Sequence, residues 1–196
     1  MDSQHGACRP GAAAHLSSAV WRAKSLRVKA TALRQAREDD YPAIAAGLQT
    51  WWNQPGMSEA GVRERAALVP RLWLQHFAGT SLVAEQQEGT LAGFLIGFLS
   101  PDRPDEGYIH FVGVAPDGRR TGTGRRLYER FFETCRQSGR TRVRCVTSPQ
   151  NTLSIAFHTA LGFEVEPGTQ GVGPILAKAD YDGPGVARVA FVRALF

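Results

Sequence analysis

Residues 119–126 combine positive charge with two glycines, a composition suited to binding a phosphate-bearing ligand. The segment reads Arg-Arg-Thr-Gly-Thr-Gly-Arg-Arg, and an apolar pattern typical of a helix begins directly after it. Gly122 and Gly124 allow the backbone to approach an anion closely and to adopt positive φ. The first amides of the helix have no intrahelical partner, and its dipole is positive there. The spacing predicts an anion site, although glycine-rich turns before helices also serve as ordinary loops.

Two well-known phosphate motifs are absent from this turn. The sequence contains neither G-x-x-x-x-G-K-[S/T] nor G-x-G-x-x-G. The surrounding segment, from Gly118 to Arg144, holds nine arginines and only two acids. Positive charge gathered beside one glycine turn favours a compact polyanion over a long nucleic-acid track.

Tyr108 and His110 are candidate proton carriers just before this turn. They alternate with Ile109 and Phe111 in an apolar segment that predicts a strand, so they and Val112 should share one face. Either side chain could relay a proton through water, and both could equally be ordinary packing residues. Glu106 is a weaker candidate for the same role.

The elements that must position these residues can be read in order along the chain. We expect strands at 29–36, 82–85, 91–98, 108–114, 142–147, 163–166 and 186–195. We expect helices from about 38 to 51, from 58 to 77 with a bend near Pro70, from 124 to 139, and from 151 to 162. The segment 168–173 is glycine-rich and is interpreted as a mobile lid or a long hairpin loop.

Several ordered motifs resemble the GNAT superfamily of N-acetyltransferases. The acetyl-CoA motif of that family, [Q/R]-x-x-G-x-[G/A], is matched by Arg119, Gly122 and Gly124. The family's preceding strand and its later helix are matched by Val112, Val114, Pro116, Asn151, Phe157, Gly162 and Phe163. The resemblance covers about residue 29 to the end of the chain, and it specifies the superfamily but no substrate.

The resemblance implies a fold and a reaction. The fold would be α/β, with a mixed, mostly antiparallel sheet, a splayed parallel central strand pair and flanking helices. The reaction would be transfer of an acetyl group from acetyl-CoA to the primary amine of a small molecule, by direct attack in a ternary complex. Two alternatives stay open: acetylation of a protein N-terminus or lysine, and a non-catalytic acyl-CoA-binding module.

The resemblance also implies which residues would bind acetyl-CoA. They comprise the end of the strand, the turn and two positions of the later helix: Val112, Gly113, Val114, Arg119, Arg120, Thr121, Gly122, Thr123, Gly124, Arg125, Asn151 and Phe157. Thr121 departs from the family, which often has a basic residue or glycine there. Gly113 would let the thioester approach closely, and its alternative interpretation is a bulge or a tight packing contact.

His158 stands where the family commonly has a tyrosine, and this departure leaves the general acid open. An imidazole can donate a proton to a departing thiolate, so we interpret His158 as the general acid, with Tyr108 or His110 as candidates for the base. A half-buried helix histidine bonded to a carbonyl is the alternative. For the acceptor we expect aromatic and imidazole groups from Trp51, Trp52 and His76, which could equally be core residues.

Composition suits one soluble domain. The chain has 196 residues and a formal net charge of +5, and no apolar run reaches the roughly 18–20 residues that cross a bilayer. We expect residues 1–28 to form a flexible N-terminal arm and residues 29–196 to form the acetyltransferase domain. Three cysteines with no metal or disulfide spacing favour a cytoplasmic protein. We expect neither metal, nucleic acid nor membrane as a partner, and the resemblance allows a homodimer.

Overall fold

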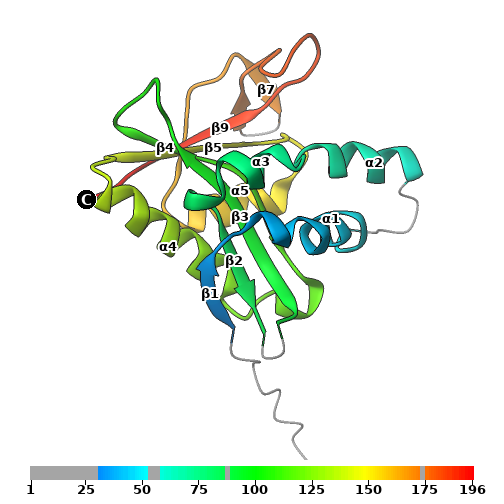
Figure 1. The fold of residues 1–196 in the computed structure, drawn as a ribbon. Coiled ribbons are helices and arrows are strands. Elements are labelled where there is room, and N and C mark those ends of the chain that lie inside the picture. Colours follow the sequence, from blue (N-terminus) through cyan, green and yellow to red (C-terminus); the bar gives the residue numbers. More distant parts are fainter. Residues whose placement is uncertain (1–30, 53–57, 87–88, 173–174) are drawn as a thin grey trace, which may run out of the picture.

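A computed structural model describes residues 31–52, 58–86, 89–172 and 175–196, which form a mixed sheet with helices on both faces (Figure 1). Seven strands follow the order β1-β2-β3-β4-β5-β9-β6, and every neighbouring pair is antiparallel except β4 and β5. The strands are β1 (Ala32–Gln35), β2 (Leu82–Glu85), β3 (Leu91–Leu99), β4 (Glu106–Val114), β5 (Arg142–Thr147), β6 (Glu164–Val165), β7 (Gln170–Val172), β8 (Ile175–Ala177) and β9 (Val189–Ala194). The helices are α1 (Tyr41–Thr50), α2 (Glu59–Ala67), α3 (Leu72–His76), α4 (Thr123–Gln137) and α5 (Thr152–Ala160), with short 3-10 turns η1 (Glu38–Asp40), η2 (Ala78–Thr80) and η3 (Pro116–Gly118). The expected fold class is confirmed.

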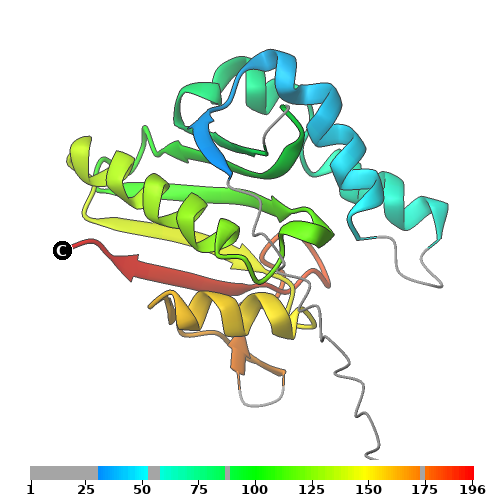
Figure 2. The same cartoon turned by 90° about the horizontal axis from the view of Figure 1, so that it is seen from below.

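Helices cover both faces of the sheet, which is seen from a second direction in Figure 2, and each face has its own apolar core. Helix α4 packs on one face through Leu127, Phe131 and Cys135, which are fully buried and recur every four residues. Helix α5 joins the same core through Ile155. Helices α1 and α3 cover the other face, where Ile44 is fully buried. The central strands are therefore held between two cores.

The parallel strands β4 and β5 pair over only part of their length. Their register runs from Glu106 opposite Arg142 to Ile109 opposite Cys145. Beyond Ile109, β4 continues to Val114 paired with β3 alone, and β5 continues to Thr147 paired with β9. The two strands thus separate at their carboxyl ends, and a gap opens in the middle of the sheet.

A β-bulge at His110 changes which face each later residue of β4 presents. Ile109 pairs with Gly97 and Phe111 pairs with the adjacent residue Ile96, so His110 is the extra residue. Phe111 consequently packs with the α1–α3 core, and Val112 packs with the α4 core. The prediction that Val112 shares a face with Tyr108 and His110 is wrong, because the bulge interrupts the alternation after His110. Tyr108 and His110 do lie on one side, where their rings pack with those of Phe98 and Trp73.

Several element boundaries differ from the expected ones. The segment 58–77 forms two helices rather than one bent helix, and Pro70, which lacks an N–H donor, lies between them. Strand β4 begins at Glu106, two residues early, and β9 begins at Val189, three residues late. The glycine-rich segment contains β7, which pairs with β8 in a separate hairpin. The predicted arm at 1–28 lies outside the described residues.

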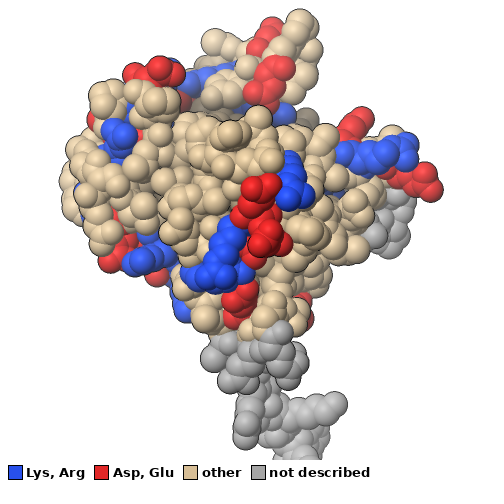
Figure 3. Space-filling view, in the orientation of Figure 1, with Lys and Arg blue, Asp and Glu red and all other residues tan. Residues whose placement is uncertain are grey.

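Charged side chains of both signs are interspersed on the face shown in Figure 3. Arg34 contacts Asp40 and Glu85, and the Nε atom of Arg71 lies 2.9 Å from Glu38. Across the described part of the chain, no helix combines the length and the apolar character needed to span a membrane.

Candidate active site

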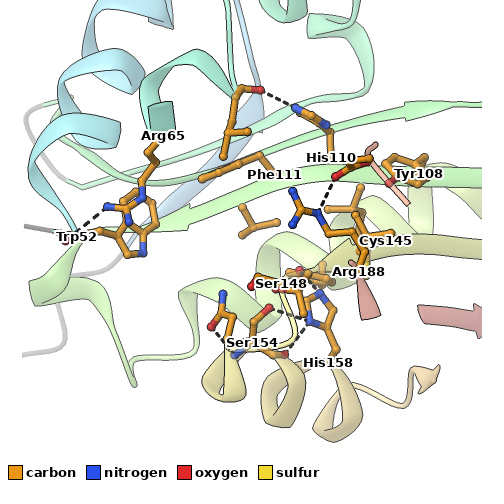
Figure 4. A pocket seen from close by; sticks show the side chains of 18 residues that line it. Trp52, Arg65, Tyr108, His110, Phe111, Cys145, Ser148, Ser154, His158 and Arg188 are labelled. Atoms are coloured by element: carbon orange, nitrogen blue, oxygen red, sulfur yellow. Dashed lines mark hydrogen bonds and ion pairs between the residues drawn. The ribbon is translucent and has the colours of Figure 1, made fainter. Parts of the chain in front are cut away.

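A cavity of about 470 Å³ lies where β4 and β5 separate (Figure 4). Its walls come from both faces of the sheet, with α4 and α5 on one side and the α1–α3 layer and the 180–188 loop on the other. The lining residues are Trp52, Arg65, Leu68, Tyr108, Ile109, His110, Phe111, Val112, Tyr128, Cys145, Val146, Thr147, Ser148, Asn151, Ser154, His158, Asp182 and Arg188. A molecule in this cavity can therefore meet groups that lie on opposite faces of the sheet.

His158 lies on the α5 side of the cavity and is only 5% exposed. Its Nδ1 atom lies 2.7 Å from the carbonyl oxygen of Ser154, and its Nε2 atom lies 2.9 Å from the hydroxyl of Tyr128. A carbonyl can only accept, so Nδ1 carries the hydrogen and Nε2 of the neutral ring accepts from Tyr128. Burial lowers the pKa of His158, which favours this neutral form.

The predicted general acid is thus bonded through both ring nitrogens. In its neutral form His158 has no hydrogen left to donate to a thiolate. A second proton on Nε2 would reverse the bond to Tyr128 and free the tyrosine hydroxyl to donate onward. Sequence reasoning missed Tyr128, because its spacing with Leu127 and Phe131 resembles a core position. The signal available was the hydroxyl of Tyr128, which flanks the apolar positions Leu127 and Phe131 of the helix.

His110 lies across the gap, on the side of the α1–α3 layer. Its Nε2 atom is 2.6 Å from the carbonyl oxygen of Leu68, so Nε2 carries the hydrogen and Nδ1 of the neutral ring keeps its lone pair. The ring stacks on Trp73, with centroids 4.2 Å apart. Burial lowers the pKa of His110, so the neutral ring is favoured at neutral pH. A neutral imidazole held in one tautomer is suited to accept a proton.

Tyr108 also lines the cavity, but its environment is less suited to proton transfer. Burial raises the pKa of its phenol, and a hydrogen bond to Tyr181 raises it further. Its ring packs on Phe98, with centroids 5.4 Å apart. A phenol of raised pKa stays protonated and can act only as a hydrogen-bond donor or acceptor near neutral pH.

The arginine-glycine turn has the backbone geometry of an anion site. Gly122 has φ +88° and precedes α4 directly, while Arg120 has φ +61°. The Arg126 amide donates to the Gly122 carbonyl, so the amides before it at the start of α4 have no intrahelical partner. The Thr121 hydroxyl lies 2.6 Å from the Gly118 carbonyl and 2.9 Å from the Thr123 hydroxyl, which braces the turn.

Three arginines of the turn have partners among the described residues, and Arg126 donates to the Thr31 hydroxyl at 2.7 Å. Arg119 donates to the carbonyl of Trp51 at 2.6 Å and to that of Val114 at 3.4 Å, so it ties the turn to the end of α1. Arg125 faces Glu129 one helical turn later, at 3.8 Å. The backbone amides at the start of α4, in contrast, have no intrahelical partner.

Gly124 connects the turn to the cavity. It lies one helical turn before Tyr128, on the same side of α4. A Cβ on Gly124 would lie 3.3 Å from the ring of Phe157, and the ring of Phe157 packs edge-on against that of Tyr128 at 5.4 Å. Phe157 is 37% exposed, so it offers an apolar surface between the turn and the cavity.

Gly113 has a packing role in this structure. A Cβ at this position would lie 2.7 Å from the Phe94 ring and 2.8 Å from the Trp52 ring. Both distances are shorter than real Cβ contacts, so these rings occupy the space that a larger residue would need. The packing interpretation of Gly113 accounts for the glycine without a bound thioester.

The remaining predicted residues are divided between the cavity and other places. Asn151 lines the cavity and caps α5, because its side chain accepts from the Ser154 amide at 3.2 Å. Trp52 lines the cavity and meets Phe111 edge-on at 5.8 Å. Trp51 packs on Phe94 and His76 is exposed on α3, and neither lines the cavity. Arg65, Asp182 and Arg188 line it without having been predicted.

The protein has a mixed sheet whose parallel strands separate beside an arginine-glycine turn. This is the arrangement expected of an acetyltransferase. Residues 30–163 match the Acetyltransferase (GNAT) family, and the chain belongs to this family. The resemblance that the turn and helix motifs indicated is therefore confirmed. In the part of the chain that the structure describes, no group of three or more His, Cys, Asp or Glu side chains could hold a metal ion.

Individual proteins support the same assignment. The chain is 38% identical over 90 residues to the L-2,4-diaminobutyric acid acetyltransferase of Nocardia farcinica, and the aligned segment covers 46% of each protein. The chain thus spans about half the length of this relative. A GNAT-family structure from Desulfovibrio desulfuricans matches with a TM-score of 0.65, 18% identity, and 85% and 100% coverage of the two chains. A diaminobutyrate acetyltransferase from Paenibacillus lautus, solved with its substrate and coenzyme A, matches with a TM-score of 0.60, 18% identity, and 85% and 96% coverage. These two structures establish the fold alone.

Proposed function

We propose that this protein transfers the acetyl group of acetyl-CoA to the primary amine of a small molecule, by direct attack in a ternary complex. The observation that carries the proposal is the cavity through the gap between β4 and β5, with His110 on one side and the Tyr128–His158 pair on the other. An acceptor entering from one face can there meet a thioester entering from the other. Holding both reactants in this geometry removes much of the entropic barrier to reaction.

The donor would lie along the α4 side of the sheet. The start of α4 and the turn at Gly122 supply amides and a positive helix dipole for the pyrophosphate. The surface of Phe157 leads from there to the cavity. Beyond Ile109, β4 no longer pairs with β5, so backbone groups on that edge are available to the pantetheine amides and the thioester oxygen. One well-placed oxyanion donor contributes roughly 3–4 kcal/mol of transition-state stabilisation.

His110 is the proposed general base. The amine nitrogen attacks the carbonyl carbon, and its proton passes to Nδ1 of His110 directly or through one water. The hydrogen bond from Nε2 to Leu68 fixes the tautomer that leaves Nδ1 as the acceptor. The lowered pKa keeps the ring neutral and ready to accept.

The Tyr128–His158 pair is the proposed acid. The carbon–sulfur bond breaks with its electron pair leaving on sulfur, and Tyr128 donates its hydroxyl proton to that thiolate. The reactive form is the minor one in which His158 has taken a second proton from solvent on Nε2, because burial favours the neutral ring. In the same step Nε2 passes this proton to the tyrosine oxygen, so Tyr128 and His158 both end neutral. No tyrosinate forms, which the raised pKa of the buried Tyr128 phenol would disfavour. The low pKa of His158 makes its protonated form a strong acid toward a thiolate, whose thiol titrates near roughly 8.5.

Trp52 and Phe111 form the proposed apolar wall of the acceptor site. The Nocardia relative is named for acetylation of L-2,4-diaminobutyric acid, which supports a small amine as the acceptor. A ribosomal-protein-S18-alanine N-acetyltransferase shares the fold equally well, so the preference for a small amine over a protein N-terminus rests on the named relative and on the cavity. A non-catalytic module does not explain the two oriented histidines.

The test is acetyl transfer by the purified full chain. Acetyl-CoA is mixed with a panel of small amines that includes L-2,4-diaminobutyrate, and with peptides that present an N-terminus or a lysine. Free thiol is followed over time and products are weighed by mass spectrometry. We expect acetylated small amine with stoichiometric thiol release. Acetylation of peptides alone, or acetyl-CoA binding without transfer to any acceptor, would reject the proposal.

A further inference from the structure

The net charge of the cavity's side chains does not complement a simple cationic amine. Among the lining residues, Arg65 and Arg188 are cationic and Asp182 is anionic. Burial keeps His110 neutral, so the formal sum of these side chains is positive. A purely cationic amine would meet a positively charged site, which disfavours its binding. An acceptor that also carries a negative group would offset that charge.

Arg188 is the lining cation that is best oriented for such a group. It precedes β9, and its guanidinium points into the cavity (Figure 4). Its Nε atom lies 2.6 Å from Oδ2 of Asp182, and the side chain is 25% exposed. Asp182 therefore holds the guanidinium by its inner nitrogen, and the two outer nitrogens lie toward the cavity.

The outer nitrogens are only weakly engaged within the described residues. Their one hydrogen bond there runs from Nη1 to the carbonyl of Ala187, at 3.4 Å. Two parallel N–H donors on a planar, permanently charged group match the two oxygens of a carboxylate. The contact with Asp182 fixes the plane of this fork, so little side-chain freedom is lost when a carboxylate binds.

Asp182 also relates this fork to the proposed base. Its negative charge acts on His110 as well as on Arg188, which places all three groups at one end of the cavity. An acceptor with its carboxylate on Arg188 would have its amine in the space shared by Asp182 and His110. The cavity of about 470 Å³ must also admit the acetyl end of the donor, which favours a compact acceptor.

We propose that Arg188, held by Asp182, binds a carboxylate of the acceptor, and that the acceptor is therefore a small amino acid rather than a simple amine. This inference rests on the proposed function and names its substrate class. It makes Arg188 a specificity-determining residue and Asp182 its positioning residue. The carboxylate contributes to binding, while the bond-making steps stay with the groups described above.

The experiment compares ligands that differ only in the carboxylate. Calorimetric titration of the protein saturated with coenzyme A uses L-2,4-diaminobutyrate, its carboxamide and 1,3-diaminopropane, which lacks the group altogether. We expect the acid to bind wild-type protein about 10–100-fold more tightly than the other two. Arg188→Gln should abolish that difference by weakening the acid alone. Arg188→Lys, which keeps the charge but lacks the fork, should retain part of it.

Further variants separate a specific role from a general loss of charge. Arg63→Gln removes an exposed arginine of α2 that does not line the cavity, so it should leave the preference unchanged. Asp182→Asn should reduce the preference less than Arg188→Gln does. The unfolding temperatures of all variants establish whether they are folded. If Arg188→Gln does not fold, Arg188→Lys is the test, because loss of the fork should reduce the preference for the acid.

The outcomes distinguish this inference from the proposed function. Equal binding of the acid and the carboxamide by wild-type protein overturns the inference, even if both are acetylated. A preference that survives in Arg188→Gln overturns the role of Arg188. Failure to transfer acetyl to any amine rejects the proposed function, whereas the binding preference is measured without turnover and stands or falls by itself.

Discussion

The hydroxyl of Tyr128 lies 2.9 Å from Nε2 of His158, and this bond joins α4 to α5 beneath the cavity. Both side chains are almost fully buried. His158 is anchored on its other nitrogen by the Ser154 carbonyl, so the pair has a defined direction. A histidine predicted to act alone is, in the folded protein, one half of a hydrogen-bonded pair.

If the pair delivers a proton as a unit, removing either half should have the same effect. His158→Phe and Tyr128→Phe keep a ring and remove the polar group, and each should slow single-turnover acetyl transfer by roughly 10²–10⁴-fold. The double variant should be no slower than the worse single variant. Rapid-quench measurement of acetylated product checks this, with acetyl-CoA affinity as the control for folding. Additive losses, or a near-normal rate in Tyr128→Phe, would leave the contact as packing only.

Cofactor binding at the turn can be tested through Gly124. Gly124→Glu places bulk against Phe157 and negative charge at the proposed pyrophosphate site. Acetyl-CoA should stabilise the wild type by roughly 2.7 kcal/mol at a hundredfold excess over its dissociation constant, and this stabilisation should vanish in the variant. The matched control is Gly171→Glu, because a Cβ at Gly171 meets no described atom within 4 Å. Unchanged stabilisation of a folded Gly124→Glu protein would place the cofactor elsewhere.

Two adjacent tryptophans allow a matched comparison at the acceptor site. Trp52 lines the cavity, whereas Trp51 packs on Phe94 outside it. We expect Trp52→Ala to raise the KM for the amine by about tenfold or more, with little change in the KM for acetyl-CoA. Trp51→Ala should lower the free energy of unfolding by at most about 3–5 kcal/mol, without a selective change in the KM for the amine. The same kinetic change in both variants would show that Trp52 acts through packing.

The pH dependence of the reaction should report His110. Its pKa is lowered by burial, so the base is neutral above about pH 6.5 and becomes protonated only as the pH falls below that value. Protonation removes the lone pair, so kcat/KM should fall on the acid side with an apparent pKa below 6.5. His110→Gln should be slower at neutral pH and should lack this acid limb. Protonation of the amine itself affects both proteins equally, so it cancels in the ratio of their kcat/KM values. A ratio that does not change with pH would exclude His110 as the base.

The conformation of the arginine-glycine turn was predictable because its signal is local. Two glycines, the adjacent arginines and the apolar repeat of α4 lie within twenty residues, and backbone conformation and helix patterning depend on near neighbours. Gly122 adopts positive φ as expected, although Gly124 lies within α4. The order of strands and helices was likewise readable, while the positions of their ends were less so.

The rest of the site depends on contacts between residues far apart in the chain. The bulge at His110 arises from its pairing with β3, and Arg188 reaches the cavity because β9 inserts beside β5. The bond from His158 to Tyr128 spans thirty positions. The sequence alone determined the family, the arginine-glycine turn before α4 and the residue types available for proton transfer. Only the tertiary structure decided which nitrogen of each histidine keeps a lone pair, because that depends on which carbonyl or hydroxyl the fold brings to the other side of the ring.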